Sequence, residues 1–221
     1  MINGIIFDFD GLILNTETIL YEALNAIFTD HGSELPVSKW QEQIGTHTGF
    51  SPFSYLEELT GHRVDHQELE ARLESDLHSR LLKEKARPGV EDYLKTAKEL
   101  GLKLGLASSS NYEWVSKYLK NLNLLHYFDC IRTAEDVEAV KPDPALYIQA
   151  AKCLGLQTAE CLVFEDSANG AIAAKHAGAR CVIVPNDITQ DLDFCPVDYR
   201  LDSMADKALE AVLEIVKAKD K

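Results

Sequence analysis

The order of apolar segments after residue 87 constrains the fold of this 221-residue chain more than any other feature. Short apolar runs there alternate with longer stretches in which apolar residues recur at the i, i+3, i+4 spacing of a helix. The short runs are typical of strands that are buried on both faces of a parallel sheet, and they cover residues 103–107, 130–133, 161–165 and 181–185. A strand-helix repeat of this kind implies right-handed crossovers. We therefore expect an α/β domain built on a doubly wound parallel sheet.

The ends of the expected helices carry the usual end signals. Ser110 and Glu113 have the spacing of a capping box, and Asp143 followed by Pro144 is typical of a helix start. Glycines stand where helices should end, at Gly101, Gly155 and Gly178.

The segment 16–86 has a different pattern, with helical stripes and no convincing strand. One stripe begins at Ile19, and another begins at Leu69, where leucines recur at strict i+4 spacing. The simplest interpretation is an all-α insertion that forms a helical cap domain. Residues 1–15 and 87–221 would then form the α/β core.

An apolar run near the N-terminus leads into two carboxylates, Asp8 and Asp10. Alternation along a strand puts both side chains on the same side, so one ion or one reacting group can contact both. Burial of an acid in such a run is expensive unless something compensates its charge. The Asp10-Gly11 pair between hydrophobic residues is also typical of a β-hairpin. These residues alone leave the hairpin and the chemical site open.

Composition excludes some classes of partner. The chain has 22 Lys and Arg against 36 Asp and Glu, and the net charge of −14 disfavours nucleic acid and anionic membrane surfaces. No apolar run approaches the length of a membrane span, and the N-terminus lacks the basic region of a signal peptide, so we expect a cytoplasmic protein. The cysteines form no metal-binding pattern and are expected to be small buried side chains in a reducing environment. They are Cys130, Cys153, Cys161, Cys181 and Cys195.

Polar residues lie where the expected strands end or the helices begin. They are Ser108, Ser109, Ser110, Lys141, Glu165 and Asp166. Each has an ordinary interpretation as a turn, a helix cap or a surface charge. Ligands of open α/β sheets bind at the carboxyl ends of the strands, however, so these residues should converge with Asp8 and Asp10. Crowded carboxylates repel one another without a cation, and Mg²⁺ suits both oxygen ligands and phosphate.

Four segments in this order resemble the motifs of the haloacid dehalogenase (HAD) superfamily. The likeness is close to its β-phosphoglucomutase-like phosphatases, which carry a helical cap after the first strand. The segments span nearly the whole chain and are Asp8-Phe9-Asp10-Gly11 with Thr16-Glu17, Ala107-Ser108-Ser109-Ser110, Val140-Lys141-Pro142 and Phe164-Glu165-Asp166-Ser167. The resemblance implies a HAD-like α/β core and a magnesium-dependent phosphatase that hydrolyses a small phosphorylated metabolite, such as a sugar or polyol phosphate monoester.

The resemblance also implies catalytic roles. Asp8 would attack phosphorus and carry an aspartyl-phosphate. Asp10 would protonate the leaving alcohol and then activate the hydrolytic water. Ser108 and Lys141 would hold the phosphoryl oxygens, with backbone N–H groups near Ser109 as further donors.

The implied magnesium ligands are the carboxylates of Asp8 and Asp166 and the backbone carbonyl of Asp10. Glu165 would bind the ion directly or through water. An acid at position 10 also favours phosphate transfer over the dehalogenase and phosphonate chemistries of the superfamily, because those do not protonate the leaving alkoxide of a phosphate ester.

The sequence departs from the family pattern at Asn15, where these phosphatases usually carry aspartate; an amide can hydrogen-bond there but has no charge. Candidate substrate contacts are Thr16 and His47, the latter in a loop flanked by glycines. The histidine and arginine that the mutases use to hold a sugar bisphosphate are not found at the corresponding positions, so hydrolysis is favoured. A phosphomutase and a non-hydrolytic phosphometabolite-binding protein remain alternatives. A monomer or a weak dimer is expected.

Overall fold

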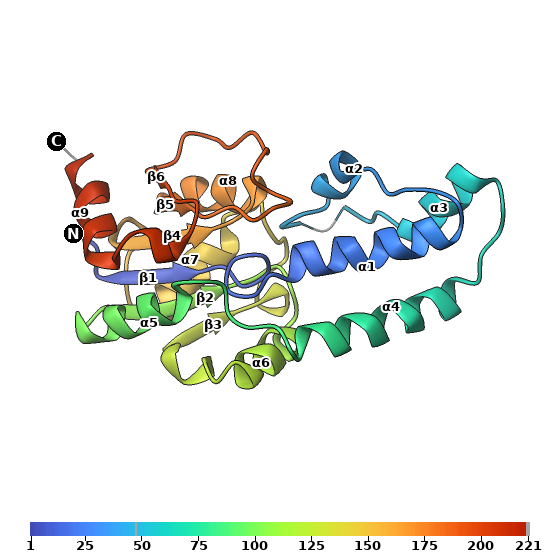
Figure 1. Cartoon of the computed structure of the whole chain (residues 1–221). Helices are drawn as coiled ribbons and strands as arrows, with labels where there is room; N and C mark the ends of the chain where they lie inside the picture. The colour runs from blue at the N-terminus through green and yellow to red at the C-terminus, as the bar shows by residue number, and fades with distance from the viewer. Residues whose placement is uncertain (47, 220–221) are drawn as a thin grey trace.

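The computed structural model describes residues 1–46 and 48–219, and its centre is a six-stranded sheet (Figure 1). All neighbouring strands pair in parallel, in the order β3-β2-β1-β4-β5-β6. The strands are β1 (Gly4–Phe7), β2 (Lys103–Ala107), β3 (Cys130–Arg132), β4 (Cys161–Glu165), β5 (Arg180–Ile183) and β6 (Tyr199–Arg200). The expected parallel α/β fold is confirmed. The edge strand β6, with two residues, is an addition that the sequence pattern does not reveal.

Helices cover both faces of this sheet. One face carries α5 (Val90–Glu99), α6 (Tyr112–Asn121) and α9 (Leu209–Ala218), and the other carries α7 (Ala145–Cys153) and α8 (Ala168–His176). Neighbouring residues of β1 point in opposite directions, so Phe7 packs into the first layer and Ile6 into the second. Both side chains are fully buried. Burial on both faces explains why the strands read as continuous apolar runs.

The hairpin interpretation of the Asp10-Gly11 pair is wrong. Strand β1 lies between β2 and β4 and pairs in parallel with both, so the chain does not fold back on β1 after Asp10. It turns instead at Gly11, whose φ of 76° favours glycine and whose N–H donates to the carbonyl of Leu14. A Cβ atom at Gly11 would also lie 2.2 Å from Oδ2 of Asp166. The turn therefore brings the backbone against the later acidic motif.

The helical segment, defined here as α1 to α4, extends away from the carboxyl ends of the strands (Figure 1). Its helices are α1 (Thr16–Asp30), α2 (Val37–Gln41), α3 (Pro52–Thr60) and α4 (His66–Leu81). They enclose a hydrophobic cluster of their own, which includes Phe28, Trp40 and Leu56 and which Ile188 joins from the loop after β5. The described residues of 16–86 contain no strand, as expected. The domain boundaries at 15/16 and 86/87 stay a prediction.

The first turn of α6 differs from the expected capping box. Asn111, and not Ser110, is the N-cap, and its side chain accepts a hydrogen bond from the backbone N–H of Trp114 at 2.8 Å. The hydroxyl of Ser110 is therefore free for another partner. Short 3₁₀ turns complete the core at Leu125–Tyr127, Ala134–Asp136, Thr158–Glu160 and Met204–Asp206.

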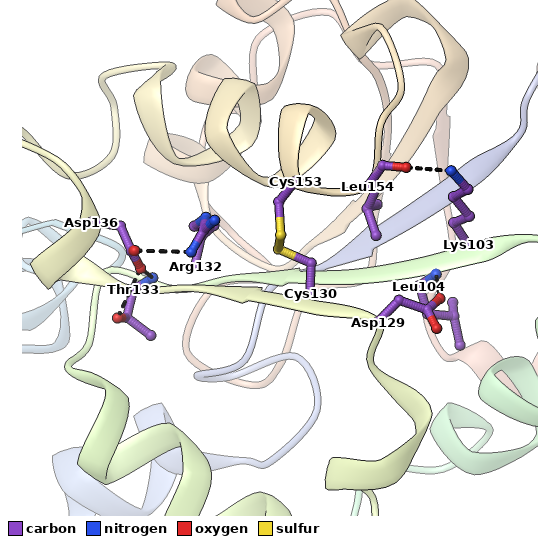
Figure 2. The surroundings of a disulfide bond; sticks show 9 residues. All are labelled: Lys103, Leu104, Asp129, Cys130, Arg132, Thr133, Asp136, Cys153 and Leu154. Atoms are coloured by element: carbon purple, nitrogen blue, oxygen red, sulfur yellow. Dashed lines mark hydrogen bonds and ion pairs between the residues drawn. A yellow bond between two sulfur atoms is a disulfide. The ribbon is translucent and has the colours of Figure 1, made fainter.

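A disulfide joins Cys130 in β3 to Cys153 at the end of α7 (Figure 2). The expectation that all cysteines are unpaired is therefore wrong for these two. Cys161 and Cys181 are free and buried, as expected of small hydrophobic side chains. Spacing cannot reveal this bond, because 23 residues separate the two cysteines and only the packing of a helix on an edge strand brings them together. Within the described ranges, no helix is long and apolar enough to cross a membrane.

Candidate active site

Polar residues at and after the ends of β1, β2 and β4 meet at the carboxyl ends of the strands, together with Lys141 from the segment between β3 and α7. Asp8 leaves β1 with its backbone N–H bonded to the carbonyl of Phe164, so the first and last acidic motifs are side by side. The set is unusually buried for such polar residues and comprises Asp8, Thr16, Ser108, Lys141, Glu165, Asp166 and Ser167. The convergence expected from the sequence is therefore present.

Lys141 joins two of these carboxylates. Its ammonium group contacts Oδ1 of Asp8 and lies 2.7 Å from Oε1 of Glu165. Burial would lower the pKa of Lys141, but the negative charges of Asp8 and Glu165 outweigh it and hold the pKa above its usual range. The lysine is therefore a fixed positive charge, only 1% exposed, at the base of the site.

Glu165 is saturated with hydrogen-bond donors. Oε1 accepts from Lys141 and from the hydroxyl of Tyr147, while Oε2 accepts from the backbone N–H of Asp166 and from both the N–H and the hydroxyl of Ser167. A carboxylate offers about four lone-pair positions, so five donors leave little room for a metal ion. A Cβ atom at Gly170 would lie 1.8 Å from Oε1, so a larger residue there would force Glu165 to move. These contacts favour a role for Glu165 in holding Lys141.

Asp8 and Asp166 lack such complete compensation. Burial raises the pKa of Asp8 well above its usual range, and Lys141 offsets only part of this effect. Burial, followed by the charges of Glu165 and Asp8, also raises the pKa of Asp166. One oxygen from each of the carboxylates of Asp8, Glu165 and Asp166 lies within 4.8 Å of the other two. A hard cation with oxygen ligands would relieve the repulsion, so the donor set fits Mg²⁺.

The side chain of Asp10 makes separate contacts. Its Oδ2 accepts from the hydroxyl of Ser110 at 2.7 Å and from that of Ser108 at 3.2 Å, and its Oδ1 accepts from the indole N–H of Trp114 at 2.8 Å. The carboxylate of Asp10 is not in the three-carboxylate cluster. Alternation along a strand predicts one shared site for Asp8 and Asp10, but the turn at Gly11 gives the two side chains different partners.

Ser109 contacts the helical segment. Its hydroxyl donates to the backbone carbonyl of Gly45 at 3.1 Å, in the loop after α2. Two further hydrogen bonds fix this loop and helix on the core: Asn169 Nδ2 donates to the carbonyl of Ile44, and Gln41 Nε2 donates to that of Ile188. Ser109 therefore lies at the contact between the helical segment and the core, and its predicted role as a phosphate ligand stays a prediction.

The start of α1 contains further predicted residues. Thr16 Oγ1 accepts from the backbone N–H of Gly11 at 3.0 Å, which supports the turn. Burial, together with the charges of Asp10 and Asp8, raises the pKa of Glu17 to about 8. Asn15 is the N-cap of α1, but its side chain caps nothing, and its Oδ1 is buried without a hydrogen-bond partner.

The predicted contact His47 lies outside the described residues. Its neighbours Thr46 and Thr48 border a cavity of about 490 Å³ between the helical segment and the sheet edge. Carboxylates and serines, including Asp8, Asp10 and Ser108, line this cavity. Apolar side chains also line it: Leu20, Trp40, Phe50, Leu77, Leu81 and Trp114. Among the described lining residues there is no lysine, arginine or histidine.

Several residues of the site escape the sequence analysis. Tyr147 and Trp114 belong to apolar helical stripes and read as core residues, although each also donates to a carboxylate. Arg87 donates to the carbonyls of Gly11, Val184 and Pro185, and Asn186 donates to Asp166. All these contacts join segments that are distant in the sequence, so local patterns do not reveal them. The one local signal for any of these residues is the position of Arg87 before Pro88-Gly89.

Comparison with known proteins agrees with this geometry. The sequence model of haloacid dehalogenase-like hydrolases matches residues 5–184. YhcW of Bacillus subtilis, which carries the name of a phosphatase, is 57% identical over 214 residues, or 97% of each chain. Hexitol phosphatase B of Escherichia coli is 30% identical over 213 residues, which cover 94% of this chain and 95% of that protein.

A solved structure shares the fold. β-Phosphoglucomutase of Clostridium difficile superposes with a TM-score of 0.73 at 23% identity, and the match covers 99% of each chain. The likeness to β-phosphoglucomutase-like proteins that the four motifs indicate is therefore confirmed at the level of the fold. Together, the match to the family model, the relatives and the convergent motifs show that the chain belongs to the haloacid dehalogenase-like hydrolase family.

Proposed function

We propose that this protein is a magnesium-dependent phosphatase that hydrolyses a small sugar or polyol phosphate monoester through an aspartyl-phosphate intermediate. One observation carries the proposal: the carboxylate of Asp8 borders the cavity while Lys141 holds one of its oxygens from the buried side. A fixed carboxylate next to a fixed cation is suited to attack on a phosphoryl group, because the attacking oxygen is oriented and the charge of the phosphoryl oxygens is offset.

In the first step, an oxygen of Asp8 attacks phosphorus and the bond from phosphorus to the ester oxygen breaks. Asp10 gives its proton to the departing oxygen, which leaves as an alcohol. The Ser108 hydroxyl lines the cavity together with both acids, and by turning away from Asp10 it can donate to a phosphoryl oxygen. Asp8 then carries the phosphoryl group, and Asp10 is ionised.

In the second step, ionised Asp10 takes a proton from water as the water oxygen attacks phosphorus. The bond between phosphorus and Asp8 breaks, which releases inorganic phosphate and restores both residues. The helical segment acts as the cap over this reaction. Hydrogen bonds from Ser109 and Asn169 of the core to the backbone of the helical segment support a position of this segment against the core, which limits access of bulk water.

Magnesium would be held by the carboxylates of Asp8 and Asp166 and by the backbone carbonyl of Asp10. When bound, it neutralises charge on the phosphoryl oxygens. Asn186 donates to Oδ2 of Asp166 at 2.7 Å and fixes the orientation of that ligand. The five hydrogen bonds of Glu165 support an indirect role, in which it positions Lys141 and the backbone of Asp166.

The cavity supports a monophosphate with an uncharged leaving group. A second phosphate would need cations, and the described lining residues supply none. Glu17 borders the same space, and its carboxyl group can form a hydrogen bond with a substrate hydroxyl. The 30% identical hexitol phosphatase B is a relative whose name matches this chemistry. The same lack of cations argues against a phosphomutase that retains a sugar bisphosphate.

The test is release of inorganic phosphate from p-nitrophenyl phosphate and from a panel of sugar and polyol phosphates, with and without MgCl₂. We expect turnover that requires magnesium and that Asp8→Asn abolishes, whereas the exposed control Asp193→Asn retains it. Turnover by purified Asp8→Asn would exclude Asp8 as the nucleophile. Tight phosphate binding without turnover would indicate a binding protein, and isomerisation without phosphate release would indicate a mutase.

A further inference from the structure

Trp114 is placed to control the orientation of Asp10. Its indole N–H donates to Oδ1 of Asp10 at 2.8 Å, while Ser108 and Ser110 both bond to Oδ2. Among the residues that the structure describes, Trp114 is the one donor to Oδ1. The terminal torsion of an aspartate is broad, and rotation about its Cβ–Cγ bond moves both oxygens. Because the two serine hydroxyls can turn to follow Oδ2, the directed N–H of Trp114 holds this torsion from the second oxygen.

The indole itself is held by its surroundings. Its ring packs edge-to-face on Tyr118, with 4.8 Å between the ring centroids, and its backbone N–H is bound by the N-cap Asn111. The ring borders the main cavity on one side and the space between α4 and α6 on the other. An indole fixed in this way presents its N–H in one direction. The position of Oδ1 therefore follows from the position of the ring.

The chemistry of the three donors differs. A serine hydroxyl can either donate or accept, but an indole N–H can only donate. Oδ1 must therefore face Trp114 with a lone pair in both protonation states of Asp10. Oδ2 can carry the proton, because Ser108 and Ser110 can turn to accept from it. The arrangement distinguishes the two oxygens of the acid.

We propose that Trp114 is a positioning residue that orients Asp10 for proton transfer, with the transferable proton on Oδ2. The inference rests on the proposed phosphatase function, in which Asp10 protonates the leaving oxygen. Proton transfer in the transition state requires the donor oxygen to face the departing one. Loss of the N–H should therefore slow the reaction most when the leaving group is basic and needs its proton.

The test compares kcat/KM for phenyl phosphate and p-nitrophenyl phosphate, because kcat/KM reports the step in which the leaving group departs. Phenolate is the more basic leaving group, and the two substrates are similar in shape. We expect Trp114→Phe to lower kcat/KM for phenyl phosphate on the order of tenfold more than for p-nitrophenyl phosphate, a fraction of the effect of a complete general acid. Tyr118→Phe, which keeps the ring beneath the indole, should leave this ratio unchanged.

A second variant separates the N–H group from the volume of the ring. Replacement of Trp114 by β-(3-benzothienyl)alanine puts sulfur in place of the N–H and preserves the shape, so it should reproduce the selective loss on phenyl phosphate. An equal loss on both esters, or no loss with the sulfur analogue, would overturn the inference. A wild-type protein inactive toward both esters in the presence of magnesium would overturn the proposed function, and with it this role of Trp114.

Discussion

The phenolic hydroxyl of Tyr147 donates a hydrogen bond to Oε1 of Glu165, and both side chains are fully buried. The oxygen that receives this bond also accepts from Lys141, so Tyr147, which lies in α7, helps to fix the ammonium group of Lys141. Burial raises the pKa of Tyr147, and the charge of Glu165 raises it further, so the hydroxyl keeps its proton. A residue that reads as core in the sequence is therefore also part of the electrostatic support of the site.

Tyr147→Phe should lower the free energy of unfolding by about 2 kcal/mol, because a buried hydrogen bond to a charged group is lost. It should also lower phosphatase activity, since Lys141 is then less well fixed. Thermal or urea unfolding measures the first effect. Tyr93→Phe is the matched control, because its hydroxyl donates to the neutral carbonyl of Lys207 away from the site. Unchanged stability of Tyr147→Phe would contradict the proposed support.

Gly170→Ala should destabilise the protein although the residue lies in helix α8. Helix propensity alone predicts a gain of about 1 kcal/mol for this change. The new Cβ would lie 1.8 Å from Oε1 of Glu165, so the glutamate must move and release its donors. The sign of the change in melting temperature distinguishes the two effects. A rise would show that Glu165 can move without cost.

The stability of the metal-free protein should fall as pH rises from about 5 to about 8. Burial raises the pKa of Glu17 to about 8 in the folded protein, whereas it is about 4.3 in an unfolded chain. Between these values the folded state binds more protons, so the free energy of unfolding decreases with pH. The raised pKa values of Asp8 and Asp166 act in the same direction. Melting temperatures in EDTA at several pH values measure the slope.

Glu17→Gln should reduce this slope, because the amide cannot titrate. The exposed Glu99→Gln is the control and should leave the slope unchanged. An identical pH dependence in wild type and Glu17→Gln would show that Glu17 does not titrate in this window.

Magnesium should stabilise the folded protein through Asp8 and Asp166. A ligand that binds only the folded state at a hundredfold excess over its Kd adds about 2.7 kcal/mol. Melting curves with increasing MgCl₂ should therefore shift upward for wild type and for Asp193→Asn. Asp166→Asn should show little shift, since one carboxylate ligand is lost. An equal shift in melting temperature for Asp166→Asn and Asp193→Asn would show that the ion binds elsewhere.

Reduction of the Cys130–Cys153 disulfide should lower stability by about 3 kcal/mol, as the loop-entropy relation gives for a closed loop of this length. Melting with and without dithiothreitol measures the effect. A double replacement of both cysteines by serine should melt at the reduced value in either condition. Cys195→Ser, at a free cysteine, should retain the response to reductant. No response in wild type would show that the bond does not contribute.

The sequence predicts the fold best where the signal is local. The apolar runs at 103–107 and 161–165 coincide with β2 and β4, because strands buried on both faces have a simple composition. Strand β6 is missed, since two residues carry no periodicity. The disulfide is missed because it depends on how α7 packs against the edge strand β3.

The residues of the site are also predicted best where a local sequence pattern marks them. Asp8, Lys141 and Asp166 stand in recognisable motifs and converge. Trp114 and Arg87 carry no motif, because each acts through a hydrogen bond to a residue far away in the chain. The start of α6 shows the limit of local reasoning, because Asn111 and not Ser110 is the helix cap. The hydroxyl of Ser110 donates to Asp10, which is distant in the sequence.

The loop after β5 makes contacts in two directions. Ile188 is buried in the cluster of the helical segment, and its carbonyl binds Gln41 in α2. Two residues earlier, Asn186 accepts from the N–H of Ile188 and donates to Asp166. Contacts of the helical segment with the core and the orientation of Asp166 thus share one short linkage. Coupling between two sites is reciprocal, so any effect of one contact on the other acts with equal strength in both directions.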